Sequence, residues 1–214
     1  MKLYHGSKDN FKSPIFGCGN PSNDYGLGFY MTPDKTAAEL WASQYKEGGH
    51  VICFNVDLKG LNVLTLDGSA ELDVLRWIAI LAKHRFPYQE RIQHQEVLSW
   101  LDRHFGISLD GYDMVVGYRA DDSYFSYSLG FVSGQISLET LSSAMRLGRL
   151  GLQYVAISKK GFQSLRYLGS YPVEPSSGYA DMRSKTLGEY HELLVREDRF
   201  HNTFIGELMK KYGE

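Results

Sequence analysis

The chain shows two hydrophobic patterns: short runs in which hydrophobic and polar residues alternate, and longer stretches in which hydrophobic residues recur at helical spacing. The helical patterns cover residues 32–45, 70–105, 122–132, 137–147 and 186–212. Strand-like runs occur at residues 2–6, 27–31, 50–56, 62–66, 113–118, 153–158 and 164–168. This order predicts an α+β fold with a mixed or antiparallel sheet.

Several residues mark where the predicted helices begin. Thr32 is predicted to cap the first helix, because Pro33 suits a first turn and Asp34 suits the positive end of the helix dipole. Ser137 is predicted to cap a later helix. Pro87 is predicted to separate two of the central helices.

Length and composition favour one globular domain over residues 1–214. The chain has 214 residues, 43% of them hydrophobic and 22% charged, which is ordinary for a globular protein that can bury a full core. No internal repeat and no linker is visible. Within the domain, residues 70–105 are interpreted as a helical insertion and residues 186–212 as C-terminal helices.

Charge and cysteine content narrow the class of protein. The net charge of -2 argues against a general binder of nucleic acids or membrane surfaces, although a local basic groove stays open. Cys18 and Cys53 form no CxxC pair and are interpreted as free thiols. No signal-peptide pattern and no apolar run near the roughly 18 residues needed to span a bilayer is visible. We therefore expect a cytoplasmic protein without a membrane partner, and no histidine or cysteine spacing indicates a metal site.

The most specific pattern lies within the first 32 residues. A strand with the sequence LYHGS carries His5, Gly6 and Ser7, and a polar loop at 8–24 separates it from a second strand that ends in Tyr30. A lone histidine at a strand end is often satisfied by the backbone, and a lone tyrosine is often a core residue. Together with a glycine backbone free of a side chain, they indicate a site for a flat ring that bears a carboxamide.

These residues resemble the ADP-ribosyltransferase superfamily, on its diphtheria-toxin and poly(ADP-ribose) polymerase side with a His–Tyr–Glu pattern. Within it, the chain is most similar to a small bacterial branch described mainly as a domain of unknown function. The matching motifs are LYHGS at 3–7, GLGFYMT at 26–32, AAELWA at 37–42, VVGYRADD at 115–122 and LQYV at 152–155. The resemblance covers about residues 1–45 and 112–168. It implies a split mixed β-sheet with surrounding helices and NAD in the cleft between its halves.

The resemblance also implies a role for each matching residue. His5 would bond the adenosine ribose of NAD, the Gly6 backbone would hold the nicotinamide amide beside the Ser7 hydroxyl, and Tyr30 would stack on the nicotinamide ring. Gln153 is the best match to the position of the superfamily's glutamate, which bonds the 2′-OH of the nicotinamide ribose. Glutamine can accept this bond through its amide oxygen but carries no negative charge.

The departure at Gln153 limits the expected activity. Losing one charged contact of this kind lowers a rate by a factor on the order of 10²–10³. Transfer of a single ADP-ribose, or weak NAD hydrolysis, is therefore expected in place of polymer elongation, and Gln153→Glu is expected to keep or raise nicotinamide release. Arg119 is interpreted either as a pyrophosphate ligand or as the ion-pair partner of Asp121, and Asp122 either caps the next helix or brings a carboxylate to the site.

The expected function is that of an NAD-dependent ADP-ribosyltransferase, with NAD as substrate and nicotinamide as leaving group. The acceptor would be a macromolecule, either protein, RNA or DNA. By family analogy alone, such a protein would be a bacterial toxin or a phage-defence effector, with an antitoxin as partner. Two alternatives stay open: an inactive module that binds NAD or ADP-ribose, and an interaction protein that docks through its helices at 70–105 and 186–212.

Overall fold

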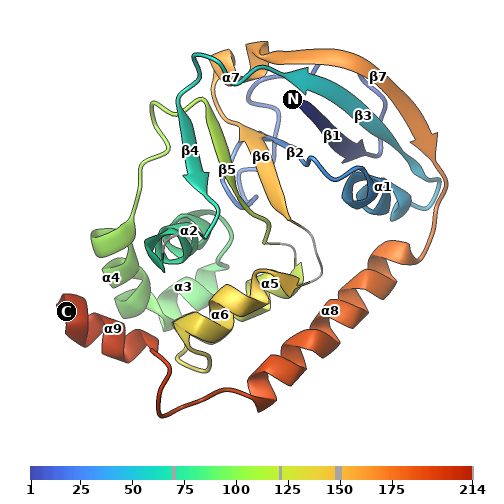
Figure 1. Ribbon diagram of the computed structural model, residues 1–214. Coiled ribbons are helices and arrows are strands. Elements are labelled where there is room, and N and C mark those ends of the chain that lie inside the picture. Colours follow the sequence, from blue (N-terminus) through green and yellow to red (C-terminus); the bar gives the residue numbers. More distant parts are fainter. Residues whose placement is uncertain (69–70, 121, 148–150, 214) are drawn as a thin grey trace.

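Strands and helices are combined in an α+β arrangement, as the sequence predicts (Figure 1). The structure is a computed structural model that describes residues 1–68, 71–120, 122–147 and 151–213. The strands are β1 (Lys2–Ser7), β2 (Phe29–Met31), β3 (Gly49–Val56), β4 (Val63–Leu66), β5 (Met114–Tyr118), β6 (Leu152–Ala156) and β7 (Leu165–Val173). The helices are α1 (Lys35–Ser43), α2 (Glu71–His84), α3 (Tyr88–Gln93), α4 (Gln95–Phe105), α5 (Asp122–Val132), α6 (Leu138–Ala144), α7 (Lys159–Gln163), α8 (Gly178–Val195) and α9 (Ile205–Tyr212).

Within the described residues, the strands form two sheets. One sheet has the order β1-β3-β7 and is antiparallel. The other has the order β2-β6-β5-β4 and is mixed, because β4 and β5 run parallel while the remaining pairs are antiparallel. An isolated bridge joins the sheets: the Tyr4 N–H donates to the Thr32 carbonyl at 2.8 Å, and the Thr32 N–H donates to the Tyr4 carbonyl at 2.9 Å.

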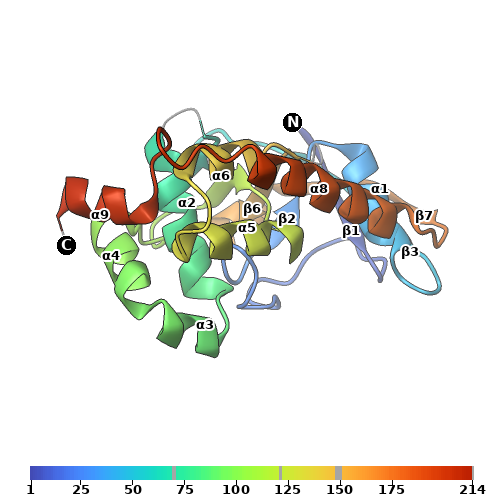
Figure 2. The ribbon, with the colours of Figure 1, turned by 90° about the horizontal axis from the view of Figure 1, so that it is seen from below.

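The two sheets and the helices pack in layers. A hydrophobic cluster between the sheets takes side chains from β1, β2, β3, β5 and β6. The other face of the mixed sheet packs against the larger helices, and this second cluster contains the buried Trp77 and Trp100. Helix α1 covers the outer face of the three-stranded sheet through Ala38 and Ala42. Helix α8 crosses from α1 to α5 and α6, which links the two ends of the molecule (Figure 2).

The start of α1 differs from the prediction. Asp34, not Thr32, caps the helix: its carboxylate accepts hydrogen bonds from the Thr36 N–H at 2.8 Å and the Ala37 N–H at 3.3 Å. Thr32 still belongs to the extended bridge with Tyr4, so the helix begins two residues later. The predicted cap at Ser137 is confirmed, since its hydroxyl accepts from the Thr140 N–H at 3.1 Å.

The C-terminal helices differ in extent from the prediction. Helix α8 begins at Gly178, well before the expected start near residue 186, and residues 196–204 separate it from α9. The predicted break at Pro87 is confirmed, because α2 ends at His84 and Pro87 precedes α3. Among the described residues, no helix combines the length and the apolar character needed to cross a membrane.

Candidate functional site

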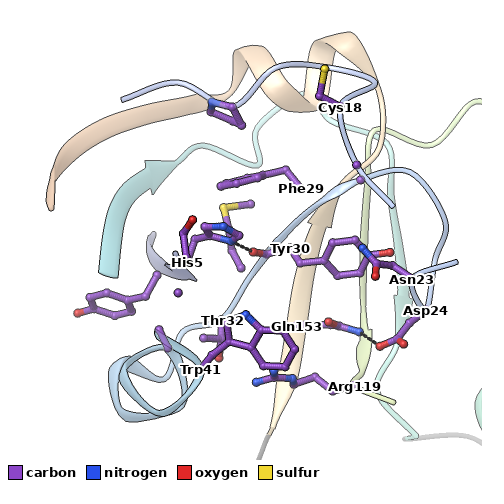
Figure 3. Close-up of a pocket in the computed structure, with 18 of the residues that line it drawn as sticks. His5, Cys18, Asn23, Asp24, Phe29, Tyr30, Thr32, Trp41, Arg119 and Gln153 are labelled. Atoms are coloured by element: carbon purple, nitrogen blue, oxygen red, sulfur yellow. Dashed lines mark hydrogen bonds between the residues drawn. The ribbon is translucent and has the colours of Figure 1, made fainter. Parts of the chain in front are cut away.

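A cavity of about 580 Å³ opens where β1, β2 and β6 meet α1. The loop between β1 and β2 forms one side of it, and residues at the end of β5 form another (Figure 3). The structure brings every predicted site residue to this cavity. These residues are His5, Gly6, Ser7, Tyr30, Arg119 and Gln153.

The imidazole of His5 is fixed in one tautomer. Its Nδ1 lies 2.7 Å from the Tyr30 carbonyl oxygen, which can only accept, so Nδ1 carries the proton and Nε2 is left as an acceptor. The ring packs against Phe29, with centroids 4.4 Å apart, and against Phe11 at 5.7 Å. Burial lowers the pKa of His5 to about 4, although the hydrogen bond to Tyr30 opposes this shift. His5 is therefore neutral at pH 7.

The backbone of Gly6 lies at a place where the two sheets separate. Continuing the antiparallel register beyond the Tyr4–Thr32 bridge would place Gly6 opposite Tyr30, with its N–H directed at the Tyr30 carbonyl. Instead, the His5 side chain donates a hydrogen bond to the Tyr30 carbonyl. The N–H and C=O of Gly6 share the edge of β1 on which Tyr4 bonds Thr32, and Gly6 lines the cavity. A donor and an acceptor thus lie side by side on the cavity wall.

Hydrogen bonds to the hydroxyl of Tyr30 fix the position of its ring. Its hydroxyl donates to the Gly26 carbonyl at 2.8 Å and accepts from the Tyr25 N–H at 3.0 Å. Burial is the main cause that raises the pKa of Tyr30 well above its ordinary value of 10, so the hydroxyl stays protonated. The ring is a fixed aromatic surface on the cavity wall (Figure 3).

The carboxamide of Gln153 is buried, with 5% of the residue exposed. Its Nε2 donates to Asp24 Oδ2 at 2.8 Å and to the Tyr118 carbonyl at 3.1 Å. Because both partners can only accept, the orientation of the amide is determined, and Oε1 remains as an acceptor. Gln153 thus offers the cavity an oxygen and not an N–H.

Asp24 is a residue of this site that the sequence did not reveal. Its Oδ1 accepts from Arg85 Nη1 at 2.9 Å, and its Oδ2 accepts from the Ala120 N–H at 2.8 Å as well as from Gln153. Burial raises the pKa of Asp24, whereas Arg85 and the hydrogen bonds oppose that shift. Donors on both oxygens favour the ionised carboxylate. No local motif signals this contact, because 129 positions separate Asp24 from Gln153.

Arg119 and Ser7 complete the predicted set. The Arg119 guanidinium lies over the Trp41 ring, 5.4 Å from its centroid, and both residues line the cavity. Its predicted alternative partner, Asp121, lies outside the described residues, as does the side chain of Asp122. Ser7 Oγ accepts from the Asp9 N–H at 3.1 Å, which ties the end of β1 to the covering loop.

Residues 1–167 match the family described as "Protein of unknown function (DUF3990)". The chain belongs to the DUF3990 family. The matched region contains all residues that line the cavity and ends within β7, so α8 and α9 lie beyond it. No curated protein and no solved structure matches the chain.

The DUF3990 cavity combines groups that suit a particular kind of ligand. An aromatic surface and a backbone donor–acceptor pair fit a flat ring with a carboxamide, while the Nε2 of His5 and the Oε1 of Gln153 can each accept a hydrogen bond from a hydroxyl. Arg119 adds a cation for an anionic group. Among the described residues, no group of three or more His, Cys, Asp or Glu side chains is placed to hold a metal ion.

Proposed function

We propose that this DUF3990 protein binds NAD in the cavity and transfers its ADP-ribose to a macromolecular acceptor, with release of nicotinamide. The observation that carries the proposal is the meeting of His5, Tyr30 and Gln153 at one cavity, although 25 positions separate the first two and far more separate them from the third. The division of the strands into two sheets that meet at the cavity supports an ADP-ribosyltransferase-like split sheet.

In the proposed complex, nicotinamide stacks on Tyr30 and its carboxamide pairs with the N–H and C=O of Gly6. The Nε2 of His5 accepts a hydrogen bond from the adenosine ribose, Gln153 Oε1 accepts one from the 2′-OH of the nicotinamide ribose, and Arg119 lies near the pyrophosphate. The bond between C1′ and the nicotinamide nitrogen breaks, and nicotinamide leaves with the electron pair. The acceptor nucleophile attacks C1′ and gives up its proton to solvent.

Holding nicotinamide and ribose in fixed positions lowers the entropic part of the barrier. The oxygen of Gln153 provides only a partial charge near the developing positive centre, so the reaction is expected to be slow relative to one assisted by a carboxylate. Gln153 therefore also favours a second candidate function, a module that binds NAD or ADP-ribose without transfer.

Incubation with NAD labelled in its adenylate moiety separates these functions. Free nicotinamide and label on protein, RNA and DNA are measured separately, for wild type and for Tyr30→Ala. Label on one acceptor class in the wild type, reduced at least about tenfold in the variant, supports transfer. Binding of NAD without nicotinamide release supports the module, and no binding of NAD rejects both.

The proposal includes a role as a toxin or phage-defence effector in the cytoplasm, with an antitoxin as partner. This role predicts that expression in bacterial cells arrests growth and that Tyr30→Ala relieves the arrest. Equal growth with both proteins would contradict it.

A further inference from the structure

A charged cluster of three side chains forms part of the cavity wall, and so far only one of them, Gln153, has a part in the proposed chemistry. It consists of Asp24, Arg85 and Gln153, which come from the β1–β2 loop, the residue after α2 and strand β6. Arg85 also donates to the Ala120 carbonyl, just beyond β5. The cluster therefore fixes the loop, the helix and two strands around one carboxylate.

The orientation of Gln153 depends on this carboxylate. A carboxamide can rotate by 180° and exchange its oxygen with its NH₂ group at nearly unchanged shape. In the rotated state, Oε1 would face Asp24 Oδ2 and the Tyr118 carbonyl, so three acceptors would oppose one another in a buried place. Leaving buried acceptors unpaired is unfavourable, which strongly favours the observed orientation.

The charge of Asp24 also acts on Gln153. Arg85 and the Ala120 N–H hold the carboxylate in place, and it faces the Gln153 NH₂ at 2.8 Å. A negative charge on the donor side of an amide polarises it and increases the negative charge on its oxygen, which is the atom that remains for the cavity.

We propose that Asp24 is a positioning residue, which orients and polarises the Gln153 carboxamide so that its oxygen accepts a ligand hydroxyl. The link to NAD rests on the proposed function, whereas the orientation of the amide does not. The Asp24–Gln153 pair thereby places a negative charge one side chain behind the oxygen that Gln153 presents to the cavity.

Nuclear magnetic resonance of the wild-type chain tests the orientation without any ligand. The two Nε2 protons of Gln153 are expected to exchange with solvent at least about tenfold more slowly than those of the exposed Gln163. Exchange as fast as that of Gln163 would overturn the proposal. This measurement needs no substitution, so it holds even if a variant fails to fold.

Asp24→Asn tests the role of the carboxylate. An asparagine must direct its NH₂ group either at Arg85 or at the Ala120 N–H and Gln153, and both arrangements oppose donors to donors. The Gln153 amide signals are therefore expected to shift and lose protection. Unchanged signals in a folded variant would contradict the proposal.

Asp113→Asn is the matched control. Asp113 is also buried and also accepts from a backbone N–H and a side chain, Asn62 and Ser158, but it does not line the cavity. Asp113→Asn is expected to lower the melting temperature while the Gln153 signals and the Kd for NAD stay unchanged.

Asp24→Asn is expected to weaken NAD binding by about tenfold, which corresponds to the loss of one hydrogen bond. If the wild type does not bind NAD, the proposed function fails, and the exchange of the Gln153 amide still decides the orientation.

Discussion

The side chain of Tyr30 divides two tasks between its ring and its hydroxyl. The ring forms part of the cavity wall, while the hydroxyl bonds the backbone of Tyr25 and Gly26 in the covering loop. The ring therefore determines what the cavity can bind, and the hydroxyl stabilises the loop.

Substitutions at Tyr30 are expected to separate these tasks. Tyr30→Phe removes two hydrogen bonds and is expected to lower the free energy of unfolding by about 1–2 kcal/mol, with the Kd for NAD within about threefold of wild type. Tyr30→Ala removes the stacking surface and is expected to weaken NAD binding at least about tenfold. Calorimetry and denaturant unfolding measure both quantities. Equal loss of NAD binding in the two variants would assign the binding role to the hydroxyl.

The contact with Asp24 revises the expectation for Gln153→Glu. A glutamate there would bring two carboxylates together in a buried place, because Asp24 Oδ2 lies 2.8 Å from the present Nε2. Such a pair raises the pKa of one member, so the variant is expected to lose stability relative to wild type as the pH rises from 5 to 8. Nicotinamide release at pH 8 is expected to fall.

The double variant with Asp24→Asn restores one carboxylate and one carboxamide. It is expected to be more stable at pH 8 than Gln153→Glu alone. Denaturant unfolding of wild type, the two single variants and the double variant measures this difference. If Gln153→Glu had the same stability relative to wild type at pH 8 as at pH 5, this result would argue against close contact between positions 24 and 153.

Some residues of the site could be predicted from a local sequence pattern, and others could not. His5, Gly6 and Tyr30 lie on two strands that follow each other in the chain, so a local pattern can indicate that they meet. Asp24 lies in a polar loop, where an aspartate is unremarkable by sequence alone. Its contacts with Arg85 and Gln153 depend on how distant elements pack, which no local pattern contains.

At the scale of elements, the absence of a side chain at Gly6 lets α1 lie directly on β1. A Cβ at Gly6 would lie 2.4 Å from the Ala38 carbonyl oxygen, which belongs to the backbone of α1. Glycine is therefore needed here for close packing of a helix on a strand, in addition to the backbone edge that it presents to the cavity.

Gly6→Ala is expected to lower the free energy of unfolding by about 1–3 kcal/mol, since either the strand or the helix must move. Gly188→Ala in α8 is the control, because a Cβ there meets nothing within 4 Å and replaces glycine inside a helix. The control is expected to raise stability by up to about 1 kcal/mol. Denaturant unfolding of both variants gives the comparison, and equal effects would contradict the close packing at Gly6.

Hydrophobic periodicity predicted the types of most elements, but it missed the short helix α7 and some of the element ends. Thr32 has the residue type of a helix cap, yet its backbone is engaged with Tyr4 on another strand, and the cap passes to Asp34. The first two turns of α8 combine Gly178 with several exposed polar residues, so their pattern carries little helical signal. In both cases tertiary contacts decide the boundary.

At the scale of the whole molecule, the half-buried imidazole of His5 couples folding to pH. Its pKa is about 4 in the folded chain, against an ordinary value of 6.5, chiefly because of burial. As the pH falls below about 6.5, the unfolded chain takes up a proton that the folded chain does not bind until about pH 4. The free energy of unfolding is therefore expected to decrease through this window, by at most about 3 kcal/mol from His5.

His5→Asn provides the comparison, because an amide can still donate to the Tyr30 carbonyl but does not titrate. Denaturant unfolding at pH 7.5, 5.5 and 4.5 is expected to show a smaller decrease for this variant than for wild type. Parallel decreases would place the responsible group elsewhere.

The isolated bridge between Tyr4 and Thr32 has a mechanical consequence for the two sheets. Beyond the hydrophobic cluster that they share, the sheets are joined near the cavity by these two backbone bonds and by the hydrogen bond between His5 and Tyr30, so we expect any opening of the cavity to strain these bonds first. A ligand that contacts both sheets is expected to hold them together and to stabilise these backbone bonds. Deuterium uptake at these two amides therefore reports occupancy of the cavity, whatever chemistry follows.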